Sequence, residues 1–305
     1  MVNFTGAVGL PIIESKSSKG GNAMTALNNA WFQQLPFQKI DSYQPVSGGD
    51  INEAFRIEAD HQSYFIKVQR HQPATYFKHE INGLKTIGKV INTPTPVYNG
   101  VINANAYLVL NWLDESTGSQ YELGQAVASM HQHESPNGQF GFTENHRTKA
   151  LVKDNSWNSD WGDFYINQRL LPEVTVAKQR GRWNRWRQSH FAQMVNSFKH
   201  YYQAHQVHPS LLHGDLWAGN FMFANNQPYL IDPDAVYGDR EFDLAMTTVF
   251  GGFSQDFYQG YNSVDPMTPG INDRLPWYRF YYLCMHLVLF GESYGPAVDQ
   301  ILGQY

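Results

Sequence analysis

Cysteine is almost absent from this chain, which has one cysteine, Cys284, in 305 residues. A disulfide framework and a cysteine-ligated metal site both need several cysteines, so both are excluded. Cys284 lies in the apolar run 280–287, which predicts a buried core position rather than a nucleophile. Charged residues are also scarce, at 16% of the chain against about 25% in typical soluble domains. This composition excludes charge-driven disorder.

The chain has neither an excess of basic residues nor a long apolar run. Its 27 acidic and 22 basic residues give a formal net charge of -5, whereas a nucleic-acid-binding protein normally presents a basic surface. The longest apolar stretches span about ten residues, half of the roughly 20 that a membrane-spanning helix needs. The N-terminus lacks the features of a secretory signal peptide. We therefore expect a cytoplasmic enzyme without nucleic-acid or membrane partners. Its oligomeric state stays open, with a monomer favoured.

Length and composition indicate how the chain is divided. At about 150 residues per domain, 305 residues predict two domains or one large two-lobed unit. Residues 1–24 show no stable period and include the flexible run 15–21. They are expected to be a flexible leader or a cloning remnant, with Met24 as the natural start. An ordered arm packed on the body of the protein is the alternative.

Hydrophobic periodicity predicts a β-rich block followed by a helical block. In the first block we expect strands at 39–47, 53–59, 62–69, 97–101 and 106–111, and helices at 26–35 and 73–89. In the second we expect helices near 117–133, 159–171, 182–205, 240–249 and 273–293, around a loop and hairpin at 211–232. This order indicates an α+β fold. We expect a small, β-rich N-lobe at 25–113 and a larger helical C-lobe at 114–305, joined near Leu113–Gly118.

Three polar residues in the second block have the spacing of a phosphoryl-transfer site. Asp215 and Asn220 lie five residues apart in a loop, and Asp232 ends an apolar strand. Phosphoryl transfer needs a carboxylate that orients the attacking hydroxyl and accepts its proton, and oxygen ligands that hold Mg²⁺ against the phosphates. The protein-kinase motif H-R-D-x-x-x-x-N followed by D-F-G has the same Asp–Asn spacing. We predict Asp215 as the catalytic base, with Asn220 and Asp232 as Mg²⁺ ligands.

The first block supplies two charged residues that such a site requires. Lys67 lies inside the apolar strand run 64–68, and Glu80 follows thirteen residues later on a predicted helix. In kinases a strand lysine reaches the ATP phosphates and a helix glutamate holds it. Each residue alone has a simpler explanation, because Lys67 would reach the surface past its neighbours and Asp215 would bond backbone N–H groups in a turn. Their combination favours a nucleotide site.

Two further segments complete the order of parts. Gly48 and Gly49 lie between two predicted strands, and adjacent glycines allow a backbone to approach phosphates closely, although a plain hairpin turn is the alternative. The last predicted strand runs into the join, where backbone groups of Asn111, Trp112 and Leu113 are placed to bond the adenine edge. Loop, lysine, glutamate, hinge, Asp–Asn pair and final Asp occur in kinase order. This order predicts an ATP site.

Longer strings surround these residues. They are L-L-H-G-D-L-W-A-G-N at 211–220, I-D-P at 231–233, Y-G-D-R-E-F-D-L-A-M at 237–246, V-S-G-G-D-I-N-E-A-F at 46–55 and F-G-G-F at 250–253. Together they closely resemble the fructosamine kinase (ketosamine-3-kinase) family, from about residue 25 to 294. They are far more specific than the H-G-D…D pattern that aminoglycoside and choline kinases share.

The resemblance implies a two-lobed, protein-kinase-like fold and an ATP- and Mg²⁺-dependent small-molecule kinase. Members of this family phosphorylate the 3-hydroxyl of a ketosamine, which forms when a sugar glycates an amine. The phosphorylated product is unstable and breaks down, so the activity removes the sugar. The implied acceptor is a fructosamine or a ribulosamine, as a free amine or on protein lysines. By the resemblance, Asp215 is the base, Asn220 and Asp232 bind Mg²⁺, and Lys67 and Glu80 serve the ATP phosphates.

The resemblance also bears on three residues around this core set. It supports a substrate contact for Trp217, because an indole stacks on a sugar or its amine substituent, and packing of the catalytic loop is the alternative. Asp243 is expected either to stabilise a helix start or to brace the catalytic loop by hydrogen bonding. Asp234 stands where many relatives have a small residue, and either metal binding or a solvent-facing position fits it.

The chain departs from the family pattern at two places. Asp50 replaces a cysteine that links dimers in some relatives, so this redox regulation is expected to be absent. The family segment P-Q-x-N-x-W is degraded at 145–157, where Asn155 and Trp157 remain. If that segment lines the acceptor pocket, substrate preference has shifted.

Two other functions stay open. One is a kinase of another amino-bearing acceptor, similar to an aminoglycoside or choline kinase. The other is a nucleotide-binding regulator without turnover. Against the regulator stands the complete set of charged and polar residues, since degenerate kinases usually lose at least one of Lys67, Glu80, Asp215, Asn220 and Asp232.

Overall fold

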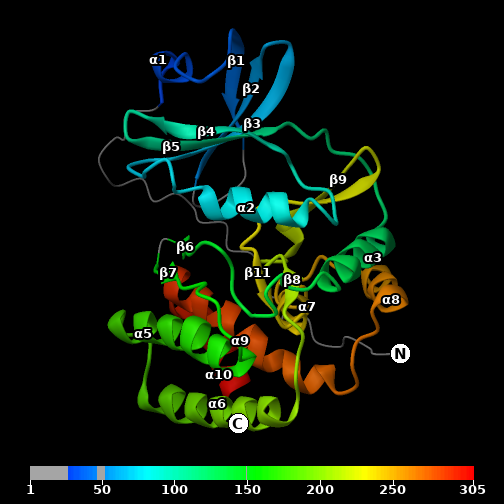
Figure 1. Ribbon diagram of the computed structural model, residues 1–305. Helices are drawn as coiled ribbons and strands as arrows, with labels where there is room; N and C mark the ends of the chain where they lie inside the picture. The colour runs from blue at the N-terminus through cyan, green and yellow to red at the C-terminus, as the bar shows by residue number, and fades with distance from the viewer. Residues whose placement is uncertain (1–26, 47–51, 149) are drawn as a thin grey trace.

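An antiparallel sheet forms the N-terminal part of the fold in the computed structural model, which describes residues 27–46, 52–148 and 150–305 (Figure 1). Its strands are β1 (Ile40–Pro45), β2 (Glu53–Ala59), β3 (Gln62–Gln69), β4 (Pro96–Ile102) and β5 (Asn105–Asn111). They lie in the order β1-β2-β3-β5-β4. Helix α1 (Asn29–Phe32) precedes the sheet, and α2 (Lys78–Ile87) lies between the sheet and the helical part below it in Figure 1.

Both faces of the sheet are covered, and the alternation along β3 decides which face each side chain joins. Ile66 and Val68 are buried in a cluster with Trp31 and Phe32 of α1. Phe65 packs in a second cluster, with residues of α2 and β5. Because successive side chains of a strand point to opposite faces, Lys67 shares the α2 face with Phe65. The strand period therefore aims Lys67 at α2.

Helices dominate the remainder of the described chain (Figure 1). They are α3 (Gln120–His131), α4 (Trp161–Tyr165), a π-helical turn at Ile166–Leu170, α5 (Leu171–Gln179), α6 (Arg185–Ala204), α7 (Glu241–Met246), α8 (Gln255–Val264), α9 (Ile271–Phe290) and α10 (Gly295–Leu302), with 3₁₀ turns at Ala218–Asn220 and Glu292–Tyr294. Two-stranded ribbons join β6 (His146–Arg147) with β7 (Val152–Lys153), β8 (Ser210–Leu212) with β11 (Val236–Gly238), and β9 (Phe221–Ala224) with β10 (Gln227–Leu230). Within the described ranges, none of the helices combines the length and the hydropathy that crossing a membrane requires.

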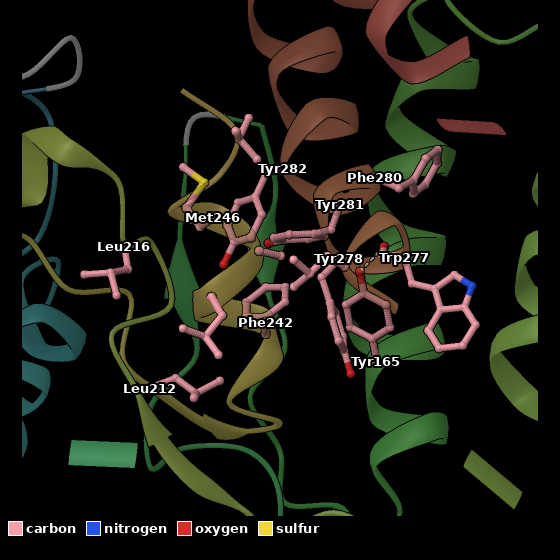
Figure 2. Packing of buried hydrophobic residues seen from close by; sticks show 14 of the residues in the cluster. Tyr165, Leu212, Leu216, Phe242, Met246, Trp277, Tyr278, Phe280, Tyr281 and Tyr282 are labelled. Carbon is pink, nitrogen blue, oxygen red and sulfur yellow. Dashed lines mark hydrogen bonds between the residues drawn. The ribbon is translucent and has the colours of Figure 1, made fainter. Parts of the chain in front are cut away.

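An aromatic core around α9 holds the helical part together (Figure 2). Tyr278, Tyr281 and Tyr282 of α9 are almost fully buried, and Phe242 of α7 stacks on Tyr282 with ring centroids 4.8 Å apart. A buried hydroxyl needs a hydrogen-bond partner. That of Tyr282 donates to the backbone carbonyl of Gly214 at 3.1 Å. This bond connects the core helix directly to the predicted catalytic loop.

The predicted α+β order is confirmed, because the sheet precedes the helices along the chain. The sheet strands lie within about two residues of their predicted bounds, and the predicted join falls in the connection 112–119 between β5 and α3. Helix α2 begins at Lys78 rather than at Pro73, because residues 74–77 form turns. The pattern did not predict α5, α8, α10, β11 or the β6–β7 ribbon. The predicted leader 1–24 lies outside the described residues.

Helices α3 and α8 approach each other so closely that their contact requires glycine. A Cβ at Gly124 of α3 would lie 2.0 Å from the carbonyl oxygen of Phe257, and a Cβ at Gly260 of α8 would lie 2.0 Å from that of Tyr121. Gly162 of α4 is different, because the nearest atom to a Cβ there is a side-chain oxygen at 3.2 Å. Of these three glycines, Gly124 and Gly260 therefore lie against the backbone of the facing helix, and Gly162 does not.

We expect Gly124→Ala to lower the free energy of unfolding by about 1–3 kcal/mol, the usual cost of overpacking. Alanine is otherwise the better helix former by about 1 kcal/mol, so the sign of the change separates close packing from helix propensity. Urea unfolding followed by circular dichroism measures the change. Gly162→Ala is the matched control and should not be destabilised. A Gly124→Ala variant as stable as the wild type would contradict the close helix contact.

Candidate functional site

A cavity of about 420 Å³ lies between the sheet and the helical part, and both parts line it. Lys67 and Glu80 contribute from β3 and α2, and Asp215, Asn220 and Asp232 contribute from the helical part. Lys67 and Asp232 are 165 positions apart in the chain and form an ion pair. The fold therefore brings these five predicted site residues to one space.

Lys67 joins the two sides of this cavity. Its Nζ lies 2.8 Å from Glu80 Oε1 and also pairs with Asp232 Oδ1. Only 5% of the surface of Lys67 is exposed. Burial alone would lower the pKa of Lys67, but attraction to Asp232 and Glu80 outweighs burial and raises it above its ordinary value. The ammonium group is therefore charged and held in place.

Asp232 has an unusual backbone conformation for a residue other than glycine, with a φ of 53°. Strain of this kind costs about 1–3 kcal/mol and persists where the surroundings fix it. The preceding residue, Ile231, is fixed on both backbone groups. Its N–H donates to the carbonyl of Asn220 at 3.0 Å, and its carbonyl lies 2.8 Å from His213 Nε2. The metal-ligand candidates Asn220 and Asp232 are thus tied to each other through the backbone.

Asp243 of α7 holds the loop that carries Asp215. Its buried carboxylate accepts the backbone N–H groups of His213 at 2.7 Å and Gly214 at 2.8 Å, and His131 Nε2 lies 3.2 Å from it. Gly214 is required here, because its φ is +80° and a Cβ would lie 1.9 Å from the carbonyl oxygen of Asp234. Of the two roles expected for Asp243, bracing of the loop is confirmed.

Asp215 and Asn220 are joined directly. The Nδ2 of Asn220 donates to the backbone carbonyl of Asp215 at 2.8 Å and to its Oδ2 at 3.1 Å. Burial raises the pKa of Asp215 to about 7, with opposing effects of Lys153, which lowers it, and Asp234, which raises it. A carboxyl group with a pKa near 7 is well matched to accepting a proton at neutral pH.

The oxygen donors beside Asp215 fit a magnesium ion. Asn220 directs its Nδ2 to Asp215, which leaves its Oδ1 for a ligand, and Asp232 uses Oδ1 for Lys67, which leaves Oδ2. Mg²⁺ prefers oxygen ligands and is usually bound by one or two protein groups together with substrate phosphates. Asn220 and Asp232 each offer one oxygen that matches that preference, so they stay the predicted Mg²⁺ ligands.

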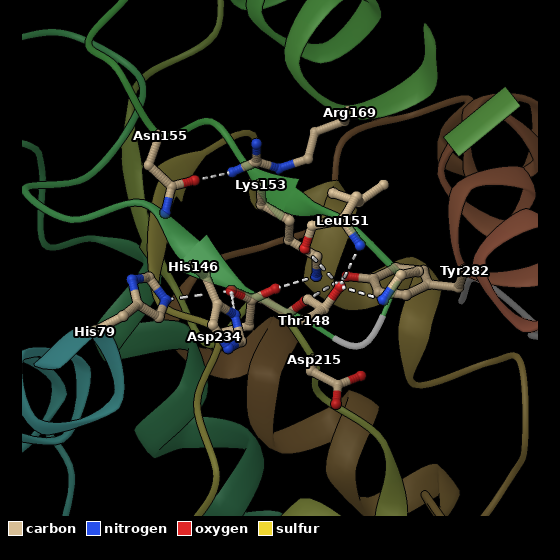
Figure 3. Close-up of polar contacts among 12 residues, drawn as sticks. His79, His146, Thr148, Leu151, Lys153, Asn155, Arg169, Asp215, Asp234 and Tyr282 are labelled. Carbon is tan, nitrogen blue, oxygen red and sulfur yellow. Dashed lines mark hydrogen bonds and ion pairs between the residues drawn. The ribbon is translucent and has the colours of Figure 1, made fainter. Parts of the chain in front are cut away.

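Asp234, two residues after Asp232, is largely enclosed by basic side chains, with 13% of its side chain exposed (Figure 3). Its Oδ2 pairs with Lys153, and its Oδ1 lies 2.7 Å from His146 Nδ1 and 3.2 Å from His79 Nε2. Burial alone would raise the pKa of Asp234, but the charge of Lys153 and the contact with His146 outweigh burial and hold it well below its ordinary value. The expectation that Asp234 faces solvent is therefore wrong.

The remaining alternative for Asp234 is a metal site. His79, His146 and Asp234 place three ligand atoms within 4.8 Å of one another. The two imidazole rings, however, are stacked, with centroids 4.6 Å and planes 10° apart. Nearly parallel rings cannot direct both in-plane nitrogens at one ion about 2 Å away. Lys153 also places a positive charge on the second carboxylate oxygen. The geometry favours an ion-pair network over a metal site.

Trp217 lies against an apolar section of the cavity wall. This section includes Met246, Phe250, Tyr282, Met285, His286, Leu289, Phe290 and Tyr294. The indole packs edge-on to Phe250, with centroids 6.5 Å apart, and it also covers Gly219, where a Cβ would lie 2.2 Å from the ring. Trp217 therefore both faces the cavity and packs on its own loop, so contacts exist for each of its two expected roles.

The β6–β7 ribbon is the part of the cavity that the sequence did not predict. It contributes His146, Arg147, Thr148, Ala150 and Lys153 to the lining. Two-residue strands carry no detectable period, and the only signal in the sequence was the degraded family segment at 145–157. The departure from the family pattern thus lies in the cavity wall.

For two groups of predicted nucleotide-binding residues the described structure shows no contact with this cavity. Gly48 and Gly49 lie outside the described residues. Asn111, Trp112 and Leu113 are not among its lining residues. The backbone N–H groups of Asn111 and Trp112 donate to carbonyls of Thr95 and Ser63, each at 3.2 Å, so these two donors are already used within the sheet. Adenine contacts at this segment stay a prediction.

Comparison with known sequences places this geometry in context. A family model described as fructosamine kinase matches residues 24–305. A Lactiplantibacillus plantarum protein named "Probable ketoamine kinase" is 50% identical over 281 residues, covering 92% of this chain and 99% of that protein. The Arabidopsis thaliana "Protein-ribulosamine 3-kinase, chloroplastic" is 32% identical over 274 residues, covering 88% of this chain and 83% of that protein.

Solved structures of fructosamine-3-kinases and aminoglycoside phosphotransferases have a fold similar to that of this chain. A crystal structure assigned as a fructosamine-3-kinase from Haemophilus somnus matches with a TM-score of 0.78 and 25% identity, over 87% of this chain and 91% of that one. The gentamicin complex of aminoglycoside phosphotransferase APH(2")-IIa matches with a TM-score of 0.61 and 16% identity, over 92% and 95%, which shows the kinase-like fold alone. Since one family model spans nearly the whole chain and its motifs surround this cavity, the chain belongs to the fructosamine kinase family.

Proposed function

We propose that this chain transfers the γ-phosphoryl group of ATP to the 3-hydroxyl of a ketosamine, acting as a cytoplasmic monomer. The observation that carries the proposal is the convergence of Lys67, Asp215, Asn220 and Asp232 on one cavity. Family membership supports the reaction class, since the relatives named above are ketoamine and ribulosamine kinases. The phosphorylated ketosamine then breaks down, which frees the amine.

Asp215 is proposed to orient the acceptor hydroxyl and to accept its proton. Its pKa of about 7 leaves a substantial fraction ionised at neutral pH while keeping it basic enough for proton transfer. Asn220 holds the carboxylate by its Nδ2, and Asp243 fixes the backbone two residues earlier. Asp215 is thereby held in one orientation before substrate enters, which is the main requirement for efficient positioning.

Lys67 is proposed to neutralise charge on the phosphates of ATP. A fixed positive charge in a partly closed cavity stabilises developing negative charge without reorganisation at the moment of reaction. Magnesium bound by Asn220 and Asp232 would supply further charge neutralisation on the transferred group. When Asp232 binds Mg²⁺, the ion pair with Glu80 would still hold the Lys67 ammonium group in the cavity.

The acceptor is proposed to be a fructosamine or a ribulosamine with a small amine substituent. A ketosamine has a hydroxylated sugar part and a protonated amine. Asp215 lies beside Trp217 and the aromatic wall, so the hydroxyl can meet the base while the substituent packs on apolar rings. Glycated protein lysines form a second acceptor class, since the end of a lysine side chain is itself a small alkyl amine.

The direct test is ADP formation from MgATP across an acceptor panel. The panel contains a fructosamine, a ribulosamine, an aminoglycoside, choline and no acceptor, with phosphorus NMR to identify the product. We expect the two ketosamines to stimulate ADP formation and to become phosphorylated at the 3-hydroxyl. Stimulation by the aminoglycoside or choline alone would replace the proposed acceptor class. ATP binding without stimulation by any acceptor would favour a regulator without turnover.

We expect Asp215→Asn to lower kcat by about 10²-fold or more, because the amide cannot accept the hydroxyl proton. Nucleotide affinity should survive, since Lys67, Glu80 and Asp232 are unchanged. Steady-state kinetics and calorimetric titration with a non-hydrolysable ATP analogue separate the two effects. Asp256→Asn, an exposed position on α8, is the control. Near-normal turnover by Asp215→Asn would refute the assignment of the base.

We expect Trp217→Ala to raise the KM for the ketosamine much more than the KM for ATP. The reason is that stacking on the sugar or its substituent is lost, while the phosphate-binding groups remain. Trp186→Ala, a partly exposed tryptophan on α6 outside the cavity lining, is the matched control. An equal rise in both KM values would indicate that the indole only packs the catalytic loop.

A further inference from the structure

The first turn of α2 makes polar contacts with the helical part of the molecule. His79, one residue before Glu80, is buried, and its Nδ1 lies 3.1 Å from the backbone carbonyl of Glu144. Its Nε2 lies 3.2 Å from Asp234 Oδ1, and its ring stacks on His146. His79, the residue next to Glu80, is therefore contacted by the Glu144 carbonyl, the Asp234 carboxylate and the His146 ring. Figure 3 shows His79 beside Asp234 and His146.

This contact is needed because α2 has a weak start of its own. The N-cap position is Phe77, which makes no side-chain hydrogen bond to the helix. The first N–H groups of a helix lack partners within it, and a capping side chain normally stabilises them by about 1 kcal/mol. Since Glu80 lies in this first turn, fraying of the turn would move the carboxylate away from Lys67.

Asp234 is the centre of the contacts on the other side. Its Oδ1 lies 3.2 Å from His79 Nε2 of α2 and is hydrogen-bonded to His146 of β6, and its Oδ2 pairs with Lys153 of β7. Only Pro233 separates Asp234 from Asp232, and the carbonyl oxygen of Asp234 lies against Gly214 of the predicted catalytic loop. The segment 232–234 thus pairs with Lys67 through Asp232 and contacts the start of α2 through Asp234.

The same helix face is packed against this segment one turn later. A Cβ at Gly83 would lie 3.0 Å from Ala235 Cβ and 3.2 Å from Pro233 Cγ, so glycine lets α2 approach this segment closely. Lys78 adds an ion pair with Glu144 at 3.3 Å. Positions 78, 79 and 83 therefore face the helical part while Glu80 faces Lys67, so the rotation and height of α2 are set by the segment around Asp234.

We propose that His79, His146, Lys153 and Asp234 form a positioning cluster, the α2 anchor, which fixes the start of α2 so that Glu80 stays on Lys67. In this arrangement Asp234 is not a metal ligand, and none of the four residues needs to touch the reacting atoms. The anchor rests on the proposed kinase function for its kinetic consequence. Its effect on nucleotide binding is independent of which acceptor the enzyme uses.

His79 is the best residue at which to test the anchor. Lys153 and Asp234 lie near enough to Asp215 to influence its pKa, so substitutions there would also change the base. His79 is not a lining residue of the cavity. His79→Phe keeps an aromatic ring for packing on His146 and removes both polar contacts.

The experiment is a double-mutant cycle between His79→Phe and Glu80→Gln. The readouts are kcat, the KM for each substrate and the Kd of a non-hydrolysable ATP analogue with Mg²⁺. We expect His79→Phe to weaken nucleotide binding and lower kcat by about five-fold or more, with the ketosamine KM changed by less than about two-fold. With Glu80→Gln already present, His79→Phe should add little, because both changes release the same ion pair.

Glu241→Gln is the control for general destabilisation. It weakens a buried ion pair with Arg274 at 2.8 Å outside the cavity, so it should lower the unfolding temperature without changing nucleotide affinity. Wild-type nucleotide affinity in folded His79→Phe would overturn the anchor, as would an effect that multiplies fully with that of Glu80→Gln. A wild-type enzyme that no ketosamine stimulates would refute the proposed function, while the binding cycle would still test the anchor.

Discussion

The buried ammonium group of Lys67 is the interaction on which the rest of this structure depends. It lies between Glu80 of α2 and Asp232 of the helical part, so one charge joins the two halves of the cavity. Removing one partner of a buried ion pair costs about 3–5 kcal/mol, because the other charge is left without compensation. The positions of β3, α2 and the segment after β10 are therefore linked, and the charges of the proposed phosphate site are placed before any nucleotide binds.

Two further carboxylates keep this arrangement rigid, and each acts on a different element. Asp243 accepts two backbone N–H groups of the catalytic loop, and Asp234 binds basic side chains from α2, β6 and β7. Neither group needs to meet the substrate to serve the reaction. Asp215 lies in a partly closed environment, and burial there raises its pKa to about 7. In the proposed mechanism Asp215 accepts the proton and Asp232 binds Mg²⁺, while Asp234 and Asp243 hold neighbouring elements in place.

The sequence predicted the parts of the site that lie within one local pattern. The five-residue spacing of Asp215 and Asn220 and the placement of Lys67 on a strand with Glu80 on the next helix follow from short segments, and the structure brings these residues together. The α2 anchor was not predicted, because His79 and Asp234 are 155 positions apart and meet only through tertiary packing. The same holds for His131 on Asp243. Helices α8 and α10 were missed although their buried residues repeat with the period of a helix; they are only ten and eight residues long, which makes the pattern short.

Substitution of Lys67 by methionine tests the central claim most directly, because it removes the charge that joins the two lobes while keeping a long apolar stem. Turnover with MgATP and a ketosamine should fall by about 10²-fold or more, since fixed charge on the phosphates is lost. Circular dichroism should show retained helix and strand content, and the Kd for a non-hydrolysable ATP analogue should rise. A folded Lys67→Met variant with turnover and nucleotide affinity within about two-fold of the wild type would contradict the account.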